Sequence, residues 1–474
     1  MSSQNTTHSN DAVERGYGLR RLTELAWPIM VNMLSMTAML VTDTIFVAQL
    51  GTEALAAIGL ATSVMFLIYA FAMGFLRGAK VIVAQRTGAG DEIAVERALW
   101  QTLWLAGFMG LIAWCVAPLG APVMGLFGSS EAVRDLGATY VTIRLLGAPL
   151  AFVMTGISCW FEGRGDTRTP MLAALIANGS NIALDPLLIF GFGPIPALGI
   201  GGAAVATILG VSLAVVFLLW RLGGRICFTF VGRGLDMPLL RAIVRVGSPM
   251  ALRGLSDVGA WIVFMGFLAL VGDTALAAHV MVARIISVSF LPGYAIGEAA
   301  SVLVGHALGA GVPEGATRAW RSGCWLALAF MSSCGVVFLT VPEWLMAPFE
   351  PTEAVALIGA ELLLIGACFQ LIDAFTMVTL GALNGAGDTR FTLVSSMICS
   401  WALNLPLAWL LIFDAGMGAA GAWSALTIEI TILTVVGIWR VRSGRWITVG
   451  LAEVARGAAE AREAMAVADG VDAA

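Results

Sequence analysis

The chain has 474 residues, of which 59% are hydrophobic and only 12% are charged, and its net charge is −5. Soluble globular chains are about 45–50% apolar and about 25% charged, so this composition excludes a water-soluble protein. It is typical of a polytopic membrane protein, and it gives no support for binding nucleic acid.

Hydrophobic segments long enough to cross a bilayer follow one another along the chain, separated by Gly, Pro and charged residues. A span needs about 20 apolar residues, so the pattern predicts an all-α polytopic membrane protein with twelve transmembrane helices. We expect these helices to begin near Leu25, Ala56, Ala94, Asp135, Thr169, Leu198, Met237, Thr274, Ala316, Ala354, Phe391 and Gly418.

The basic residues lie almost entirely on one side of the predicted spans. Arg15, Arg20 and Arg21 precede the first span. In the loops on the opposite side, Arg134 is the only basic residue. Because cytosolic loops carry an excess of Lys and Arg, we expect both termini in the cytosol and an even number of spans.

The first half of the chain resembles the second half at a nearly constant spacing. Pro28 matches Pro249, and the segment GRGDTR at 163–168 matches GAGDTR at 385–390. Each half has six spans, which predicts two parallel six-helix repeats, an architecture typical of transporters. We expect a first lobe at 25–222 and a second lobe at 237–441, joined by a cytosolic loop at 223–236. A cytosolic N-terminal segment at 1–24 precedes the first lobe, and a cytosolic tail at 442–474 follows the second.

Two carboxyl groups are predicted at membrane depth in the first half. Asp43 lies in the first span, and Asn181 and Asp185 lie in the fifth, with Thr207 in the sixth. Carboxylate, amide and hydroxyl oxygens can hold a hard cation such as Na⁺, and two nearby carboxyl groups can instead share a proton. The alternative is pairing that only holds helices together. Further polar residues predicted on the same helix faces are Asn32 and Asn178.

A second acidic pair, Asp257 and Asp373, is predicted in the second half. Charged side chains within spans are costly and usually mark a substrate or ion pathway, so a coupling or substrate site is one interpretation. Arg253 lies one helical turn before Asp257, so a local ion pair is the alternative. His279 is a further candidate polar residue, although an isolated histidine at this depth is more often packed. Glu429 is an additional acid without an assigned role.

These motifs together resemble the multidrug and toxic compound extrusion (MATE) family. The resemblance covers residues 20–445 and rests on PIMVNMLSMTAMLVTDTIFVAQLGTEALAAIG at 28–59, NIALDPLLIFGFGPIPALGIGGAAVAT at 181–207 and the paired Gly-Asp-Thr-Arg turns. It implies two six-helix lobes in a V that alternate between inward-facing and outward-facing states. It also implies export of amphipathic cationic compounds in exchange for protons or sodium.

By position, the resemblance places Asp43, Asn181, Asp185 and Thr207 at the cation or proton site of the DinF-like branch. Asp257 and Asp373 occupy places where NorM-like members carry acidic residues, although that branch usually has Glu. The resemblance therefore implies antiport by mutual exclusion, in which protonation or sodium binding displaces a cationic substrate.

Two other functions share part of this pattern. A lipid-linked oligosaccharide flippase shares the helix number and the duplication, but would be expected to use cationic groups where this chain has mostly acids. An intramembrane enzyme would need a nucleophile or a metal-binding motif, and none is recognisable. We therefore expect a non-enzymatic, monomeric transporter in a bacterial cytoplasmic membrane. Its expected contacts are small cationic amphipathic substrates and membrane lipid, and it needs no cofactor beyond the coupling ion, H⁺ or Na⁺.

Overall fold

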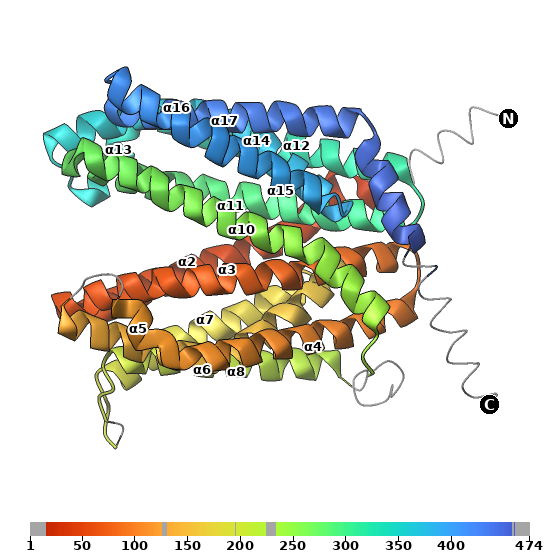
Figure 1. Ribbon diagram of the computed structural model, residues 1–474, viewed down its shortest axis with the longest axis horizontal. Coiled ribbons are helices and arrows are strands. Elements are labelled where there is room, and N and C mark those ends of the chain that lie inside the picture. The colour runs from red at the N-terminus through yellow and green to blue at the C-terminus, as the bar shows by residue number, and fades with distance from the viewer. Residues whose placement is uncertain (1–15, 126–129, 195, 224–233, 457–458, 460–474) are drawn as a thin grey trace. The chain divides into compact units, whose positions relative to one another are not determined.

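The computed structural model describes residues 16–125, 130–194, 196–223, 234–456 and 459. Within these ranges, twelve helical segments are long and apolar enough to cross a membrane. Figure 1 shows how the helices follow one another along the chain. The predicted fold class, an all-α polytopic membrane protein, is confirmed, and the predicted helix starts lie within a few residues of the observed ones.

The first six spans are formed by α2 (Leu19–Ala48), α3 (Thr52–Gly88), α4 (Glu92–Val116) with α5 (Gly120–Gly125), α6 (Glu131–Gly163), α7 (Arg168–Ile189) and α8 (Ile200–Leu222). Turns between them are short, because glycines such as Gly51 and Gly90 adopt the positive φ angles that other residues avoid. A large buried apolar cluster joins these helices.

The second six spans are formed by α10 (Met237–Val271), α11 (Asp273–Gly309), α12 (Pro313–Thr340), α14 (Glu353–Gly385), the composite span Thr389–Asp414, and α17 (Gly418–Arg442). The short α13 (Pro342–Met346) connects α12 to α14. In the composite span, α15 (Thr389–Met397) and α16 (Leu405–Trp409) alternate with π-helical segments at Ile398–Asn404 and Leu410–Asp414. Pro406 lacks an N–H donor, which accounts for the shift of the hydrogen-bond ladder around it.

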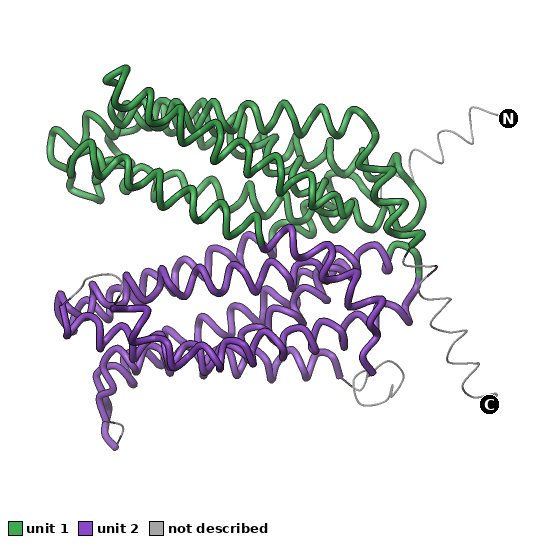
Figure 2. Tube along the Cα trace, viewed as in Figure 1, with its two compact units in different colours: residues 1–27, 88–90, 252–456 green, residues 28–87, 91–251, 457–474 purple. Residues whose placement is uncertain are grey.

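The chain divides into two compact units, coloured separately in Figure 2. We call residues 28–87, 91–251 and 457–474 the N-unit, and residues 1–27, 88–90 and 252–456 the C-unit. The division falls inside α2, between Trp27 and Pro28, and inside α10, two residues after Pro249. The first helix of each repeat therefore begins in one unit and continues in the other.

The start of α10 is fastened to the N-unit by backbone and side-chain contacts. The Gln101 amide donates to the Gly234 carbonyl at 3.0 Å and accepts from the Asp236 N–H at 3.0 Å. Asp236 in turn caps α10 by accepting from the Leu239 N–H. Gly78 of α3 and Gly247 of α10 lie so close to the opposite backbone that a Cβ at either position would collide with it. Small residues thus permit this close helix crossing.

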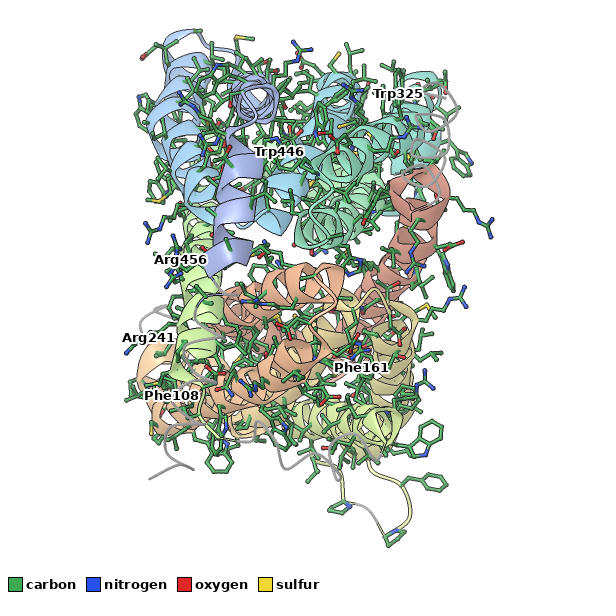
Figure 3. The ribbon with its side chains drawn as sticks, turned by 90° about the vertical axis from the view of Figure 1, so that its right-hand side faces the viewer. Phe108, Phe161, Arg241, Trp325, Trp446 and Arg456 are labelled. Atoms are coloured by element: carbon green, nitrogen blue, oxygen red, sulfur yellow. The ribbon has the colours of Figure 1, made fainter. Side chains whose placement is uncertain are left out.

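The boundaries of the predicted lobes, 25–222 and 237–441, lie at helix ends. The boundaries of the compact units instead fall inside α2 and α10, because they follow the packing of the chain. Most of the predicted inter-lobe loop and parts of both terminal segments lie outside the described residues. In the tail, residues 445–456 are helical. Trp446, labelled in Figure 3, is fully buried and donates to the Val441 carbonyl at 3.0 Å, which holds this helix against the end of α17.

The duplicated Gly-Asp-Thr-Arg turns join α6 to α7 and α14 to α15, but their aspartates have different partners. Asp166 accepts from the Thr169 N–H at 3.0 Å, as expected for a residue that caps the following helix. Asp388 makes no such cap and instead accepts from Arg440 Nε at 2.8 Å. A capping aspartate is therefore present at the first turn and absent from the second.

Candidate functional site

Four predicted site residues meet in the N-unit. Asp43 comes from α2, Asn181 and Asp185 from α7, and Thr207 from α8, and all four are at least nine-tenths buried. Asn181 and Asp185 are four residues apart on α7, so their side chains lie on the same face of the helix. The N-unit thus gathers two carboxyl groups, an amide and a hydroxyl at one place.

Asn181 lies at the centre of this group. In one orientation of its amide, Nδ2 lies 3.3 Å from both Asp185 Oδ1 and Thr207 Oγ1. In the opposite orientation, Nδ2 donates to Asp43 Oδ1 at 2.8 Å and the oxygen accepts from the Thr207 N–H at 3.3 Å. The second orientation matches donors to acceptors better. In either case the amide N–H₂ is directed to a carboxyl group.

The carboxyl groups of Asp43 and Asp185 interact with one another, and each has an oxygen within hydrogen-bond distance of the Asn181 amide. Asp185 Oδ2 is buried and has no other donor within the described part of the chain. Two like charges this close cannot easily both be ionised, so such a pair holds one proton readily. This acid pair can therefore exchange protons or replace them by a cation.

The local helix geometry explains why the acids come together. α7 and α8 cross closely at Gly202 and Gly210, where a Cβ would collide with the α7 backbone. Pro186 follows Asp185 directly and lies inside α7. Because proline has no N–H, a backbone carbonyl one turn earlier loses its helical partner at this point. The acid pair is thus placed where the helix is most easily distorted.

The two additional polar residues predicted in the first half have different surroundings. Asn178 donates to Ser35 Oγ at 2.8 Å and so joins α7 to α2 one turn from the acid pair. Asn32 is only partly buried, and its carbonyl accepts from Ser35 Oγ at 2.8 Å. This chain of hydrogen bonds continues the polar strip from Asn181 along the helices.

Arg144 of α6 is a charged neighbour of the acid pair that was not assigned to this site from the sequence. Its guanidinium carbon lies 5.6 Å from the centre of the Tyr69 ring, and the Tyr69 hydroxyl contacts the Arg144 carbonyl at 3.5 Å. Arg144 interacts electrostatically with Asp43. Residue spacing along α6 predicts neither partner, because both belong to other helices.

In the C-unit, the predicted partners Asp257 and Asp373 have different surroundings. Asp257 pairs with Arg253 at 3.4 Å on α10, as in the alternative interpretation of this segment, and its side chain is partly exposed. Asp373 of α14 is fully buried, and neither carboxyl oxygen has a hydrogen-bond partner among the described residues. The other members of the polar network around Asp257 therefore come from elements other than α14.

Glu429 of α17 is the buried acid that interacts with Asp257. Ser400, in the first π-helical segment, donates to Glu429 Oε1 at 2.6 Å. The neighbouring Trp401 donates to Ser256 Oγ at 2.9 Å, which links this segment to α10 next to Asp257. An acid within a span is a recognisable signal, but its partners on two other helices are not apparent from the sequence.

His279 is fully enclosed by aromatic side chains. Ring centres of Trp261, Phe264 and Trp423 lie between 5.3 and 5.9 Å from the imidazole, and Trp423 Nε1 donates to His279 Nδ1 at 3.2 Å. This is the packed, hydrogen-bonded environment of a structural histidine. Within the described residues, no group of three or more His, Cys, Asp and Glu side chains could hold a metal ion.

Comparison with known proteins identifies the family. The MatE family model matches residues 28–187 and 249–410. The chain belongs to the MatE family of transporters. The two matched segments begin at Pro28 and Pro249, the residues that open the two sequence repeats, so the family comparison detects the same duplication.

Relatives match over nearly the whole chain. The multidrug resistance protein NorM of Burkholderia vietnamiensis is 31% identical over 424 residues, which cover 88% of this chain and 92% of that protein. A probable multidrug resistance protein NorM of Deinococcus radiodurans is 32% identical over 436 residues, covering 90% of this chain and 96% of that protein. These matches do not favour the lipid-flippase alternative.

Solved structures share the fold. A multidrug resistance MATE family transporter in an outward-facing conformation has a TM-score of 0.84 at 24% identity, covering 92% of this chain and 98% of that one. A MATE structure in a bent conformation has a TM-score of 0.85, covering 93% and 98%. The protein is therefore a multi-pass membrane protein with the MATE transporter fold.

Proposed function

We propose that this protein is a secondary active multidrug exporter that exchanges amphipathic cationic compounds for protons or sodium by alternating access. The observation that carries the proposal is the buried group of Asp43, Asn181, Asp185 and Thr207. The proposal is also supported by the relatives, several of which are named multidrug resistance proteins. Transport rather than catalysis is the activity proposed for the chain.

Coupling in this proposal is competition for the acid pair. With Asp43 and Asp185 deprotonated, the pair attracts a cationic substrate, and Asn181 and Thr207 supply polar atoms beside it. Protonation from outside, or binding of Na⁺ to the same oxygens, removes this attraction and releases the substrate. Direction comes from the ion gradient, because a ligand shifts the two states only through its different affinity for them.

The C-unit has a secondary place in the proposal. Asp257, with its partners Arg253 and Glu429, and the buried Asp373 are proposed to bind a second ion or the substrate. The protein is proposed to act as a monomer in a bacterial cytoplasmic membrane with both termini in the cytosol. Its proposed ligands are small molecules and surrounding lipid, with no nucleic acid and no bound cofactor.

The experiment is efflux of the fluorescent cation ethidium from proteoliposomes under a proton gradient or a sodium gradient, imposed separately. We expect one gradient to drive efflux, and the variants Asp43→Asn and Asp185→Asn to abolish it. The control Asp135→Asn changes an exposed acid at the start of α6 and should leave efflux unchanged.

Efflux that survives both N-unit substitutions but is lost in Asp257→Asn or Asp373→Asn would assign coupling to the C-unit. If neither gradient drives export of any cationic compound, the proposed function is contradicted. Each variant is first checked for insertion and for its amount in the membrane, so that loss of transport is not confused with loss of protein.

A further inference from the structure

Arg144 is a partly buried basic group that the acid-pair mechanism does not use. Its Nε is fully buried and has no hydrogen-bond acceptor within the described residues. A charged side chain within a span is costly, and such residues usually have a role in a pathway. The only direct support for the guanidinium that the structure describes is the Tyr69 ring at 5.6 Å.

The surroundings of Arg144 are those of the acid pair. The titratable groups that interact with it electrostatically are Asp43 from α2, Tyr69 from α3, and Tyr140 one turn earlier on α6. Tyr140 also interacts electrostatically with both Asp43 and Asp185. Ile143 and Gly147, on either side of Arg144, lie against Gly201 and Ile208 of α8, so this part of α6 packs along the helix that contributes the uncharged Thr207 hydroxyl. The arginine and the two acids therefore form one electrostatic unit.

Arg144 changes the charge that a substrate meets. Without it, the acid pair would carry two, one or no negative charges as it takes up protons, and a cation would never be repelled. With a permanently charged guanidinium, the same steps give a net charge of minus one, zero and plus one. Full protonation then makes the site positive.

We propose that Arg144 converts protonation of the acid pair into electrostatic repulsion of a bound cationic substrate. Arg144 is thus a specificity-determining residue of the N-unit, and this inference rests on the function proposed above. One unit charge a few ångströms from a bound ion, in a partly polar interior, changes its affinity by on the order of tenfold or more.

The test compares a cationic with an uncharged probe on the purified full-length protein. Dissociation constants for ethidium and for neutral Nile red are measured at alkaline and at acid pH in wild type, Arg144→Gln and Arg144→Lys. We expect the Gln variant to bind ethidium about tenfold or more tightly at acid pH, with Nile red affinity unchanged. Lys retains the charge and should restore weak ethidium binding.

Transport provides a second readout. Because tighter binding slows release, Arg144→Gln should lower both KM and kcat for ethidium efflux, whereas Arg144→Lys should stay close to wild type. The matched control is Arg134→Gln, on the same helix, whose charge is paired with Glu131 and Asp135 at the surface. It should change neither constant.

The outcomes separate the two proposals. If wild-type protein binds ethidium equally well at acid and alkaline pH, protonation of the acid pair does not control substrate binding, and both the proton form of the proposed coupling and the inference about Arg144 are contradicted. If wild type shows the pH dependence but Arg144→Gln binds ethidium no more tightly at acid pH, or binds both probes differently, the inference about Arg144 is overturned and the residue is structural. Should the Gln variant not insert, Arg144→Met makes the same charge change with an apolar side chain of similar length.

Discussion

Ser400 donates a 2.6 Å hydrogen bond to Glu429 inside the C-unit, where both side chains are more than nine-tenths buried. Removing a donor from a buried acid leaves it unsatisfied, which costs about 1–3 kcal/mol. We expect Ser400→Ala to lower the thermal unfolding temperature in detergent. The control is Ser333→Ala, which removes an exposed hydroxyl bonded only to its own helix. An equal loss in both variants would contradict the importance of the pair.

Asn181 is expected to matter more for transport than Asn178, although they lie one turn apart on α7. Asn181 contacts the acid pair and Thr207, whereas Asn178 contacts Ser35. Asn181→Ala should reduce ethidium efflux by about tenfold or more, because the acids lose their amide partner. Asn178→Ala loses one neutral hydrogen bond, worth about 0.5–1.5 kcal/mol of stability, and should retain most activity. Comparable efflux from both variants would contradict this assignment.

The two homologous turn aspartates are expected to differ in stability effect. Asp388 pairs with Arg440 at 2.8 Å, and both side chains are largely buried. Asp388→Ala leaves a buried guanidinium without its counter-ion, which should cost about 3–5 kcal/mol. Asp166→Ala removes a helix cap and should cost about 1 kcal/mol. The measurement is chemical unfolding of each variant, and a larger loss at Asp166 would show that the Arg440 pair is dispensable.

Asp373 provides a test that separates function from stability. Because both of its buried oxygens have no partner among the described residues, Asp373→Leu should stabilise the protein by about 1–3 kcal/mol. Gln370→Leu, one turn earlier, loses a 2.6 Å bond to Ser289 and should destabilise. A stabilised Asp373→Leu protein that no longer transports would identify this acid as functional; unchanged transport would leave it as a replaceable buried acid. Loss of stability on substitution would contradict the structural argument.

The helices could be predicted closely from the sequence, and the partners of their side chains only in part. Hydrophobic length and glycine positions place the spans, because both are properties of single segments. The N-unit group was predictable because Asn181 and Asp185 share one helix face, which fixes half of the site. Asp257 could not be matched to Glu429 in this way, since two separate helices and a π-helical segment determine that contact.

The partners of Arg144, a basic residue, could not be predicted from the sequence either. On the linear sequence it is an isolated basic residue within an apolar segment. Its neighbours Tyr69 and Asp43 come from helices that precede it by many residues. The rotation of α6 about its axis decides whether such a side chain contacts an acid, an aromatic ring or lipid. Helical periodicity predicts which residues share a face of α6, but not which helix that face contacts.

The division of α2 and α10 between the two units bears on whether a repeat can fold by itself. In each repeat, the first turns of the opening helix belong to the unit formed mostly by the other repeat. Residues 237–251 of the second repeat belong to the N-unit, where Gly247 lies against the backbone of α3. Expressed alone, the second repeat would leave this segment without its partners, so the two repeats depend on one another for folding.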